Sequence, residues 1–431
     1  MPTTIARGVV LIAKLVHRLA MSSPNARSVT VVGAGPAGLA LACALHDAGL
    51  AVQVLEQQSA DVLAAPAEDG REIALTHRGR AVMQSLGLWQ HLPPGEVAPL
   101  CQARVTDGSG PLVLQFGGDA AAGAAPGGPL GWLVPNHLIR AAAWRAVLDR
   151  PAVQVQCDAR VTGLALPPAD DARRPAVLQL ADGRRLRAPL VVAADSRFSA
   201  TRRLAGIGAA MRDFGRSVVV GRVAHDGDHQ GIAWECFRYG NTLALLPMNG
   251  GQSSAVVTVP GHRATEWLAL SDEAFAARVG AQSGGHLGTL QVVGPRHHYP
   301  LVGVLAHQFV APRFALIGDA AVGMHPVTAH GYNFGLYGVE VLARQLQKAR
   351  QAGRDIGNLS VLQPYAVEHR RTTLPVYLGT NAVVTLFTDD RPPARLARRA
   401  VLTVAERAPA IGWLIKSAIT RQLTGVPKAA A

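Results

Sequence analysis

Cysteine, aromatic residues and long apolar runs are all scarce in this 431-residue sequence. The four cysteines, Cys43, Cys101, Cys157 and Cys236, lie far apart and form no paired motif, which excludes a disulfide framework and a zinc site. No apolar run approaches the roughly 20 residues that a transmembrane helix needs. We therefore expect a cytoplasmic protein without a metal site, either soluble or bound to a membrane surface.

Acidic residues are also few, 29 against 42 lysines and arginines, and the formal net charge at pH 7 is +13. This balance favours anionic partners such as phosphates, nucleic acid or lipid headgroups. The basic residues are scattered and form no nucleic-acid-binding module, so we do not expect nucleic acid as a partner. A chain that is 49% hydrophobic and 16% charged is not globally disordered, and its length predicts two domains, or one large domain with an insert.

The first strong motif is glycine-rich and lies within residues 28–57. An apolar strand leads into the sequence GAGPAG, a helix follows, and a second strand ends at Glu56. Gly33 permits a tight turn, Gly35 lets the backbone approach a pyrophosphate, and Gly38 lets the helix pack closely on the strand. Glu56 is placed to accept hydrogen bonds from ribose hydroxyls, which argues against a 2′-phosphate. The pattern predicts binding of FAD or NAD.

A second stretch, residues 314–336, has the order expected of a ligand site. A short apolar strand runs into Gly318-Asp319, and a helix begins near Gly331. A carboxylate just past a buried strand can accept hydrogen bonds from ligand hydroxyls, and the N–H groups at the start of a helix can stabilise negative charge. Taken alone, the same residues also fit an ordinary strand, turn and helix.

Two further segments allow both a cofactor role and a structural role. Arg71 follows a charged turn and can lie near a phosphate or a flavin, or form a surface salt bridge. Asp195, at the end of a buried strand, and Arg202 can contact a cofactor. Equally, Asp195 and Ser199 can cap a short helix.

The remaining segments define the expected architecture. Residues 217–259 alternate in short strands with glycine turns, which predicts antiparallel sheet. Residues 153–161 and 177–186 are predicted to form a hairpin pair, with an Asp182-Gly183 turn nearby. Residues 360–386 are predicted to be helical, with a break near Pro375.

Both ends of the chain combine apolar and basic residues. Residues 1–20 fit an amphipathic helix at a membrane interface, or an upstream extension. Residues 391–425 fit a tail that contacts anionic membrane, or one that packs on its own domain. The sequence leaves both alternatives open.

In combination, these motifs resemble those of the flavoprotein aromatic hydroxylases, which are single-component FAD monooxygenases. The resemblance rests on residues 33–38 with Glu56, residues 195–199 with Arg202, and residues 318–319 with 325–326. Within this family the chain is most similar to the ubiquinone-biosynthesis hydroxylases of the UbiH, UbiF and UbiM group, and to the UbiM type above all. The segments ALTHRG (74–79), LALLPM (243–248), HPVTAHGYNFGL (325–336) and VTLFTDDRPPARLARR (384–399) carry that similarity.

The resemblance implies an α/β fold, with a glutathione-reductase-type, Rossmann-like FAD-binding domain, an antiparallel-sheet substrate domain and C-terminal helices. The implied boundaries are an N-terminal extension at 1–27, a discontinuous FAD-binding domain at 28–102, 130–205 and 291–360, a substrate domain at 103–129 and 206–290, and a C-terminal helical region at 361–431.

The resemblance also implies individual contacts. Arg71 matches a flavin-side arginine, Asp319 an aspartate at the ribityl and pyrophosphate part, and Gly331 and Asn333 the helix start beside the isoalloxazine ring. The residues expected to bind FAD are Gly33, Gly35, Gly38, Glu56, Gln57, Arg71, Asp195, Gly318, Asp319, Pro326, Gly331 and Asn333.

Two positions depart from the family pattern. Ser196 stands where the second motif usually has glycine, at a contact attributed to the pyridine nucleotide. Ala329-His330-Gly331 replaces the usual Gly-Gln-Gly, so an imidazole lies where an amide is expected. His330 and His325 are the candidate bases for a substrate phenol, with a structural role as the alternative for each.

The implied activity is hydroxylation of the aromatic ring of a polyprenyl quinol precursor in ubiquinone biosynthesis, a demethoxyubiquinol-type reaction that uses dioxygen and proceeds through a flavin hydroperoxide. The sequence leaves two candidates for the electron donor, NAD(P)H as a transient reductant and another protein. Peripheral contact with the inner membrane and association with other quinone-biosynthesis proteins follow from such a substrate. The alternatives are a hydroxylase of a soluble aromatic compound and a non-catalytic flavoprotein scaffold.

Overall fold

The computed structural model describes residues 28–107, 113–117, 128–168, 171–238, 240–325, 330–388 and 391. The expected N-terminal extension and amphipathic helix, the basic tail beyond 391, and Pro326 lie outside this part of the chain.

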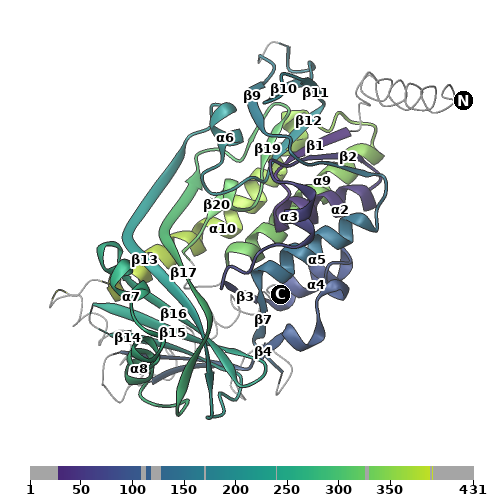
Figure 1. Ribbon diagram of the computed structural model, residues 1–431. Coiled ribbons are helices and arrows are strands. Elements are labelled where there is room, and N and C mark those ends of the chain that lie inside the picture. The colour runs from purple at the N-terminus through teal and green to yellow at the C-terminus, as the bar shows by residue number, and fades with distance from the viewer. Residues whose placement is uncertain are drawn as a thin grey trace, which may run out of the picture.

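A six-stranded sheet forms the centre of the predicted FAD-binding part (Figure 1). Its order is β18 (Val310–Ala311), β19 (Phe314–Leu316), β12 (Leu190–Ala193), β1 (Ser28–Val32), β2 (Ala51–Leu55) and β8 (Val153–Gln156). All neighbours pair in parallel except β18 and β19. Every residue of β12 is buried, as expected of a parallel strand that is covered on both faces. The glycine-rich turn follows β1, so it lies at the carboxyl end of this sheet.

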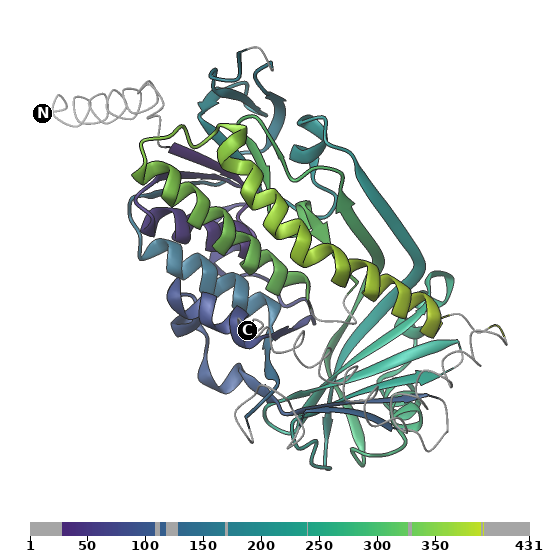
Figure 2. The ribbon, with the colours of Figure 1, turned by 180° about the vertical axis from the view of Figure 1, so that it is seen from behind.

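Helices cover this sheet and pack on one another. Helix α2 packs against both α9 and α5, and α4 packs against α9. Figure 2 shows the long α10 running along α9. The helices of this part are α2 (Pro36–Asp47), α3 (Ala60–Ala64), α4 (His77–Ser85), α5 (Asn136–Leu148), α6 (Ala200–Leu204), α9 (Gly331–Gln351) and α10 (Leu359–Thr388). The largest buried apolar cluster lies between these helices and the sheet.

Two small antiparallel sheets are attached to this body. One has the order β3 (Glu72–Leu75), β7 (Gly131–Pro135) and β4 (Ala98–Leu100); the other has the order β11 (Arg185–Ala188), β10 (Ala176–Leu180) and β9 (Val161–Ala165). The predicted hairpin between residues 153–161 and 177–186 is wrong, because β8 instead joins β2 in the parallel sheet. The turn at Asp182-Gly183 connects β10 to β11.

An eight-stranded sheet forms the second part, and the antiparallel pattern predicted for residues 217–259 is confirmed. Its order is β20 (Val322–Gly323), β17 (Leu290–Ala306), β13 (Ala209–His225), β16 (Gln252–Pro260), β15 (Asn241–Met248), β14 (Ile232–Arg238), β5 (Gln102–Asp107) and β6 (Val113–Gly117). The short helices α7 (Ala264–Leu268) and α8 (Asp272–Ser283) cover one face.

Strands β13 and β17 belong to both parts of the molecule. Each is 17 residues long, and they pair antiparallel with register shifts along their length. At one end Ala306 lies in the core of the FAD-binding part, whereas Val219 and Val223 lie in the core under α7 and α8. Figure 1 shows both strands running from the region of α6 down to the second sheet. The expected domain boundaries therefore remain predictions.

Helix α10 differs from its prediction at Pro375. The break expected there is wrong, because α10 is continuous and contains both Pro364 and Pro375. Proline removes the hydrogen bond to the carbonyl four residues earlier, here that of Arg371. Pro375 and Arg371 are both exposed, so water can satisfy that carbonyl and the helix continues.

Candidate active site

The glycine-rich turn has the geometry that close approach of a phosphate requires. Gly33 has a φ of +106°, and a Cβ at this residue would lie 2.8 Å from the carbonyl oxygen of Ala194. Gly35 is the N-cap of α2 and has no side chain to occupy the N-terminal N–H groups. Among the described residues, a Cβ at Gly35 would have only the Ala194 carbonyl oxygen within 4 Å, at 3.9 Å. The start of α2 is thus open to an anion.

Glu56 is fixed beside this turn. Its Oε2 accepts a hydrogen bond from the Ala34 N–H at 2.6 Å, and its Oε1 accepts one from the Gln58 N–H at 2.9 Å. A carboxylate has about four acceptor positions, so both oxygens retain capacity for ribose hydroxyls. Gln57 follows it as an exposed residue. Its FAD contact remains a prediction.

The structure brings together the segments that contain Asp195 and Asp319. Arg197 donates to the Asp319 carboxylate at 2.9 and 3.2 Å, and the buried Arg202 donates to the Ala320 carbonyl at 2.9 Å. Asp319 lies on the short 3-10 turn Gly318–Ala320 that follows β19. The predicted site contained Asp319 but not Arg197. The one sequence signal for Arg197 was its position inside the 195–199 motif.

Asp195 combines a structural contact with one open oxygen. Its Oδ2 accepts from the Thr201 N–H at 3.1 Å, and Ser199 caps α6 by accepting from the Arg202 N–H at 2.8 Å. The capping interpretation is therefore confirmed for Ser199. The Oδ1 atom of Asp195, in contrast, is buried and has no hydrogen-bond partner within the described residues. Such an acceptor is expected to face a donor from a ligand.

Asn333 connects the start of α9 to the loop between β3 and α4. Its Oδ1 accepts from the Thr76 N–H and hydroxyl, both at 3.0 Å, and its Nδ2 donates to the Ala74 carbonyl at 2.8 Å. Thr76 also caps α4 by accepting from the Gly79 N–H. Sequence reasoning named Asn333 and the 74–79 motif separately and missed their contact.

The N-terminus of α9 has room beside it. A Cβ at Gly331 would meet no atom of the described residues within 4 Å, and His330, the N-cap, makes no side-chain capping bond to them. The α9 helix has 21 residues, so its first N–H groups carry a full helix dipole. This end of α9 can therefore stabilise negative charge on a ligand.

Arg71 lies in an ion pair. Its guanidinium is 2.6 Å from the Asp69 carboxylate and lies over the Tyr299 ring, 5.2 Å from its centroid. The Arg71 side chain is 45% exposed. Of the two interpretations of Arg71, the structure therefore shows the surface salt bridge, formed with Asp69. A flavin contact from the same side chain remains a prediction.

The two candidate bases are both buried. Burial, followed by the charges of Arg197 and Arg216, lowers the pKa of His325 to about 4, which makes this imidazole a weak base near neutral pH. Its ring packs edge-on against Phe214 at 5.0 Å. His330 lies 5.3 Å from the ring of Phe334. Neither contact assigns a catalytic role.

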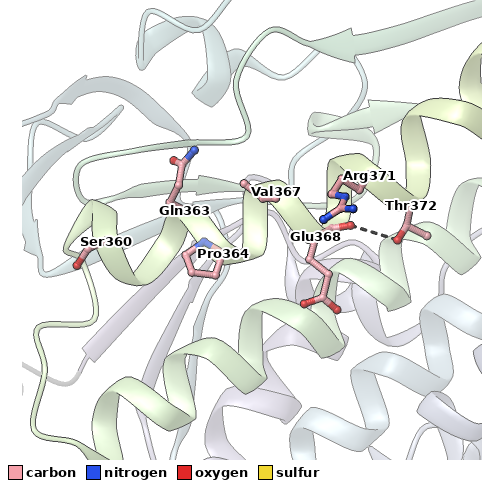
Figure 3. Close-up of a pocket in the computed structure, with 7 residues that line it drawn as sticks. All are labelled: Ser360, Gln363, Pro364, Val367, Glu368, Arg371 and Thr372. Carbon is pink, nitrogen blue, oxygen red and sulfur yellow. Dashed lines mark hydrogen bonds between the residues drawn. The ribbon is translucent and has the colours of Figure 1, made fainter. Parts of the chain in front are cut away.

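Two surface grooves lie away from these residues. One, of about 670 Å³, follows α10, and Figure 3 shows its lining, Ser360, Gln363, Pro364, Val367, Glu368, Arg371 and Thr372. The other, of about 780 Å³, lies between α2, α4 and α9. Neither lining includes a predicted FAD-binding residue.

Within the described part of the chain, no group of three or more His, Cys, Asp or Glu side chains could hold a metal ion.

The whole chain was compared with known proteins. A family model described as an FAD binding domain matches residues 26–366. Ubiquinone hydroxylase UbiM of Neisseria meningitidis is 43% identical over 397 residues, which are 92% of this chain and 84% of UbiM. The chain belongs to the family of FAD-dependent ubiquinone hydroxylases. Ubiquinone hydroxylase UbiL of Rhodospirillum rubrum is 38% identical over 90% of this chain and 87% of UbiL.

This hydroxylase shares its fold with more distant proteins of known structure. The crystal structure of p-nitrophenol 4-monooxygenase PnpA from Pseudomonas putida aligns with a TM-score of 0.71, over 93% of this chain and 98% of PnpA. Because the sequence identity is only 20%, this likeness shows the fold alone. The protein is an FAD-dependent monooxygenase with the expected α/β fold, a second sheet and C-terminal helices.

The residues present fit FAD. The turn at Gly33 leaves no space for a side chain, the start of α2 is uncapped by any side chain, and Glu56 has free acceptor positions. Asp195, with its open Oδ1, follows β12, and Asp319 follows β19, so both lie at the same carboxyl edge of the six-stranded sheet as the turn at Gly33. The individual FAD contacts remain predictions.

Proposed function

We propose that this hydroxylase adds an oxygen atom to the aromatic ring of a polyprenyl quinol precursor of ubiquinone, in a demethoxyubiquinol-type reaction. The observation that carries the proposal is the 43% identity with ubiquinone hydroxylase UbiM over nearly the whole chain. FAD, when bound, supplies the oxygen-activating chemistry. The protein must hold the cofactor, orient the ring and exclude water.

The chain's own residues divide these tasks. Glu56 and the turn at Gly33 would hold the adenosine and pyrophosphate, and Asp319, oriented by Arg197, would hold the part nearer the flavin. The N–H groups at the start of α9 would stabilise negative charge at the pyrimidine edge of the flavin. Asn333 fixes that helix end against Ala74 and Thr76, so its direction is set before any ligand binds.

An apolar surface next to these residues suits an aromatic ring with a prenyl tail. On the eight-stranded sheet, Ala233, Ala244, Leu246 and Val256 are only partly buried. Ala233 and Leu246 pack with Leu100 and Leu133 of the small β3–β7–β4 sheet, which lies between the two parts of the molecule. Apolar walls of this kind keep water away from a reactive cofactor.

The proposed substrate lies in a membrane, so the proposal also includes contact between the enzyme surface and that membrane. None of the helices that the structure describes is long and apolar enough to cross a membrane. Helix α10 exposes Leu359, Val367, Leu378 and Val383, and the chain is strongly basic. Exposed apolar groups with positive charge favour adsorption to anionic lipid. Flotation with phosphatidylglycerol vesicles, compared with phosphatidylcholine vesicles, tests this, and no difference between them would contradict it.

The substrate is tested in living cells. Expression in bacterial strains that each lack one ring hydroxylase of ubiquinone biosynthesis should restore ubiquinone in the strain that accumulates demethoxyubiquinone, as measured by the quinone profile. Unchanged accumulation of that precursor would contradict the proposed reaction. Oxidation of NADH and NADPH by the purified holoenzyme, with and without a short-chain quinol, would identify the reductant. No oxygen uptake with either would favour a non-catalytic flavoprotein.

A further inference from the structure

The two faces of the eight-stranded sheet are covered by different elements. Val219, Cys236 and Leu243 point to the face that packs under α7 and α8. Side chains alternate along a strand, so Ala233, Glu235 and Ala244 lie on the opposite face, here called the inner face. Figure 1 shows β3, β4 and β7 on that side, between the sheet and helices α4 and α5.

The inner face borders the predicted flavin site. Ala233 and Leu246 pack with Ala74 of β3 in a small apolar cluster. The carbonyl of Ala74 accepts a hydrogen bond from Asn333, two residues after Gly331 at the start of α9. A ligand on the inner face near Ala233 would therefore lie next to the end of α9 that is predicted to face the isoalloxazine ring.

Glu235 is an ionisable residue in the middle of this face, and Arg222, two residues after Val220 on β13, is another. Strand register places it opposite Val105 on one side and Ala244 on the other, and the same row continues through Val256 to Val220. Glu235 is partly accessible, and no hydrogen bond or ion pair joins it to the described residues. A partly buried carboxyl group among apolar neighbours is costly unless it serves a ligand.

The pKa of Glu235 fits a group that exchanges a proton with a ligand. Burial raises the pKa of its carboxyl group to about 7, so it can gain or lose a proton under ordinary conditions. His325, with a pKa near 4, is the weaker base. Glu72 also has a pKa of about 7, but its side chain is 1% exposed and engaged by Arg222. Of these two described carboxyls with a raised pKa, Glu235 is thus the more accessible.

We propose that Glu235 binds the ring hydroxyl of the substrate and accepts its proton during hydroxylation, which rests on the proposed function. The O–H bond of the phenol breaks, an O–H bond forms on the carboxylate, and the electron pair stays on the phenolic oxygen. That pair raises the electron density of the ring carbon that receives the oxygen atom. When this carbon releases its hydrogen as a proton and the ring regains aromaticity, Glu235 returns its proton to the ring oxygen.

The test compares purified, FAD-loaded variants with a short-chain demethoxyubiquinol as substrate. Glu235→Gln keeps the size and polarity of the side chain but cannot accept the proton, so kcat should fall about 100-fold or more while KM changes little. Glu235→Asp should retain a larger share of kcat than Glu235→Gln. Glu266→Gln, in an exposed ion pair on α7, is the matched control and should leave kcat unchanged.

The variant Glu235→Leu separates the proposed catalytic role from a purely structural one. Glu235→Leu removes an isolated carboxyl from an apolar face, so it should raise the melting temperature and leave FAD content intact, yet abolish turnover. A kcat for Glu235→Gln within about threefold of the unmodified enzyme, or a lower melting temperature for Glu235→Leu, would overturn the proposal. If the unmodified enzyme itself does not hydroxylate the quinol, the proposed function fails rather than the role of Glu235.

Discussion

Replacing Asn333 with alanine tests whether the start of α9 is held by one side chain. Among its contacts, the Asn333 amide makes hydrogen bonds with the N–H and hydroxyl of Thr76 and with the carbonyl of Ala74. All are buried or partly buried, so the variant would leave a backbone N–H and a backbone C=O without their partner. Each such loss costs about 1–3 kcal/mol, which gives about 2–6 kcal/mol for the pair. That is a large share of the typical stability of a folded protein.

The assay is urea denaturation of the FAD-free and FAD-loaded proteins, with FAD affinity measured by fluorescence. We expect Asn333→Ala to lower the free energy of unfolding by the stated amount and to weaken FAD binding, because α9 is no longer fixed against the β3–α4 loop. Asn249→Ala is the matched control. The Asn249 amide also donates to two backbone carbonyls, those of Gly95 and Val97, but in an exposed position. The control should change stability by less than about 1 kcal/mol. A similar small change for Asn333→Ala would refute the reasoning.

Three further predictions concern the cofactor site and its surroundings. Asp319→Ala should give colourless protein on purification, while loss of its partly exposed pair with Arg197 should cost less than about 1 kcal/mol of stability; full FAD occupancy would contradict the placement. Gly331→Leu adds a side chain where a Cβ meets no atom of the described residues, so FAD content should fall with no loss of stability of the FAD-free protein. Unchanged absorbance at 450 nm would argue against a ligand there. Burial raises the pKa of Glu72 to about 7 although Arg222 opposes this, so its contribution to stability is complete below pH 4.5 and is lost as pH rises through 7. Glu72→Gln should reduce that decline in urea titrations at pH 5 and pH 8; an unchanged decline would mean that Glu72 is ionised throughout.

Local chemistry explains which features the sequence could predict. The turn at Gly33 and the start of α9 at Gly331 depend on backbone geometry and on short-range patterns, and both lie where they were expected. The break at Pro375 was a local rule that the structure overrode, because the residues affected face solvent. The hairpin error has the same origin, since a short apolar segment such as Val153–Gln156 does not reveal which strand it will join.

Long-range contacts account for what the sequence could not predict. Asn333 and Thr76 are 257 residues apart, and Arg197 and Asp319 are 122 apart. Pairing between such residues is fixed by the packing of whole sheets, not by any nearby signal. Glu235 shows the same limit, because its importance depends on strand register, which decides whether it points to the inner face or under α8.

Strands β13 and β17 have a consequence for engineering this enzyme. Because both strands are continuous through the two parts of the molecule, no single cut separates a cofactor module from a substrate module. A chimera that takes its substrate sheet from a relative must exchange both strands at matching points. The irregularity between Asp213 and Ser217 is the natural junction, because pairing is already interrupted there. Recombination elsewhere along these strands would shift one strand against the other and turn apolar side chains from one face of the sheet to the other.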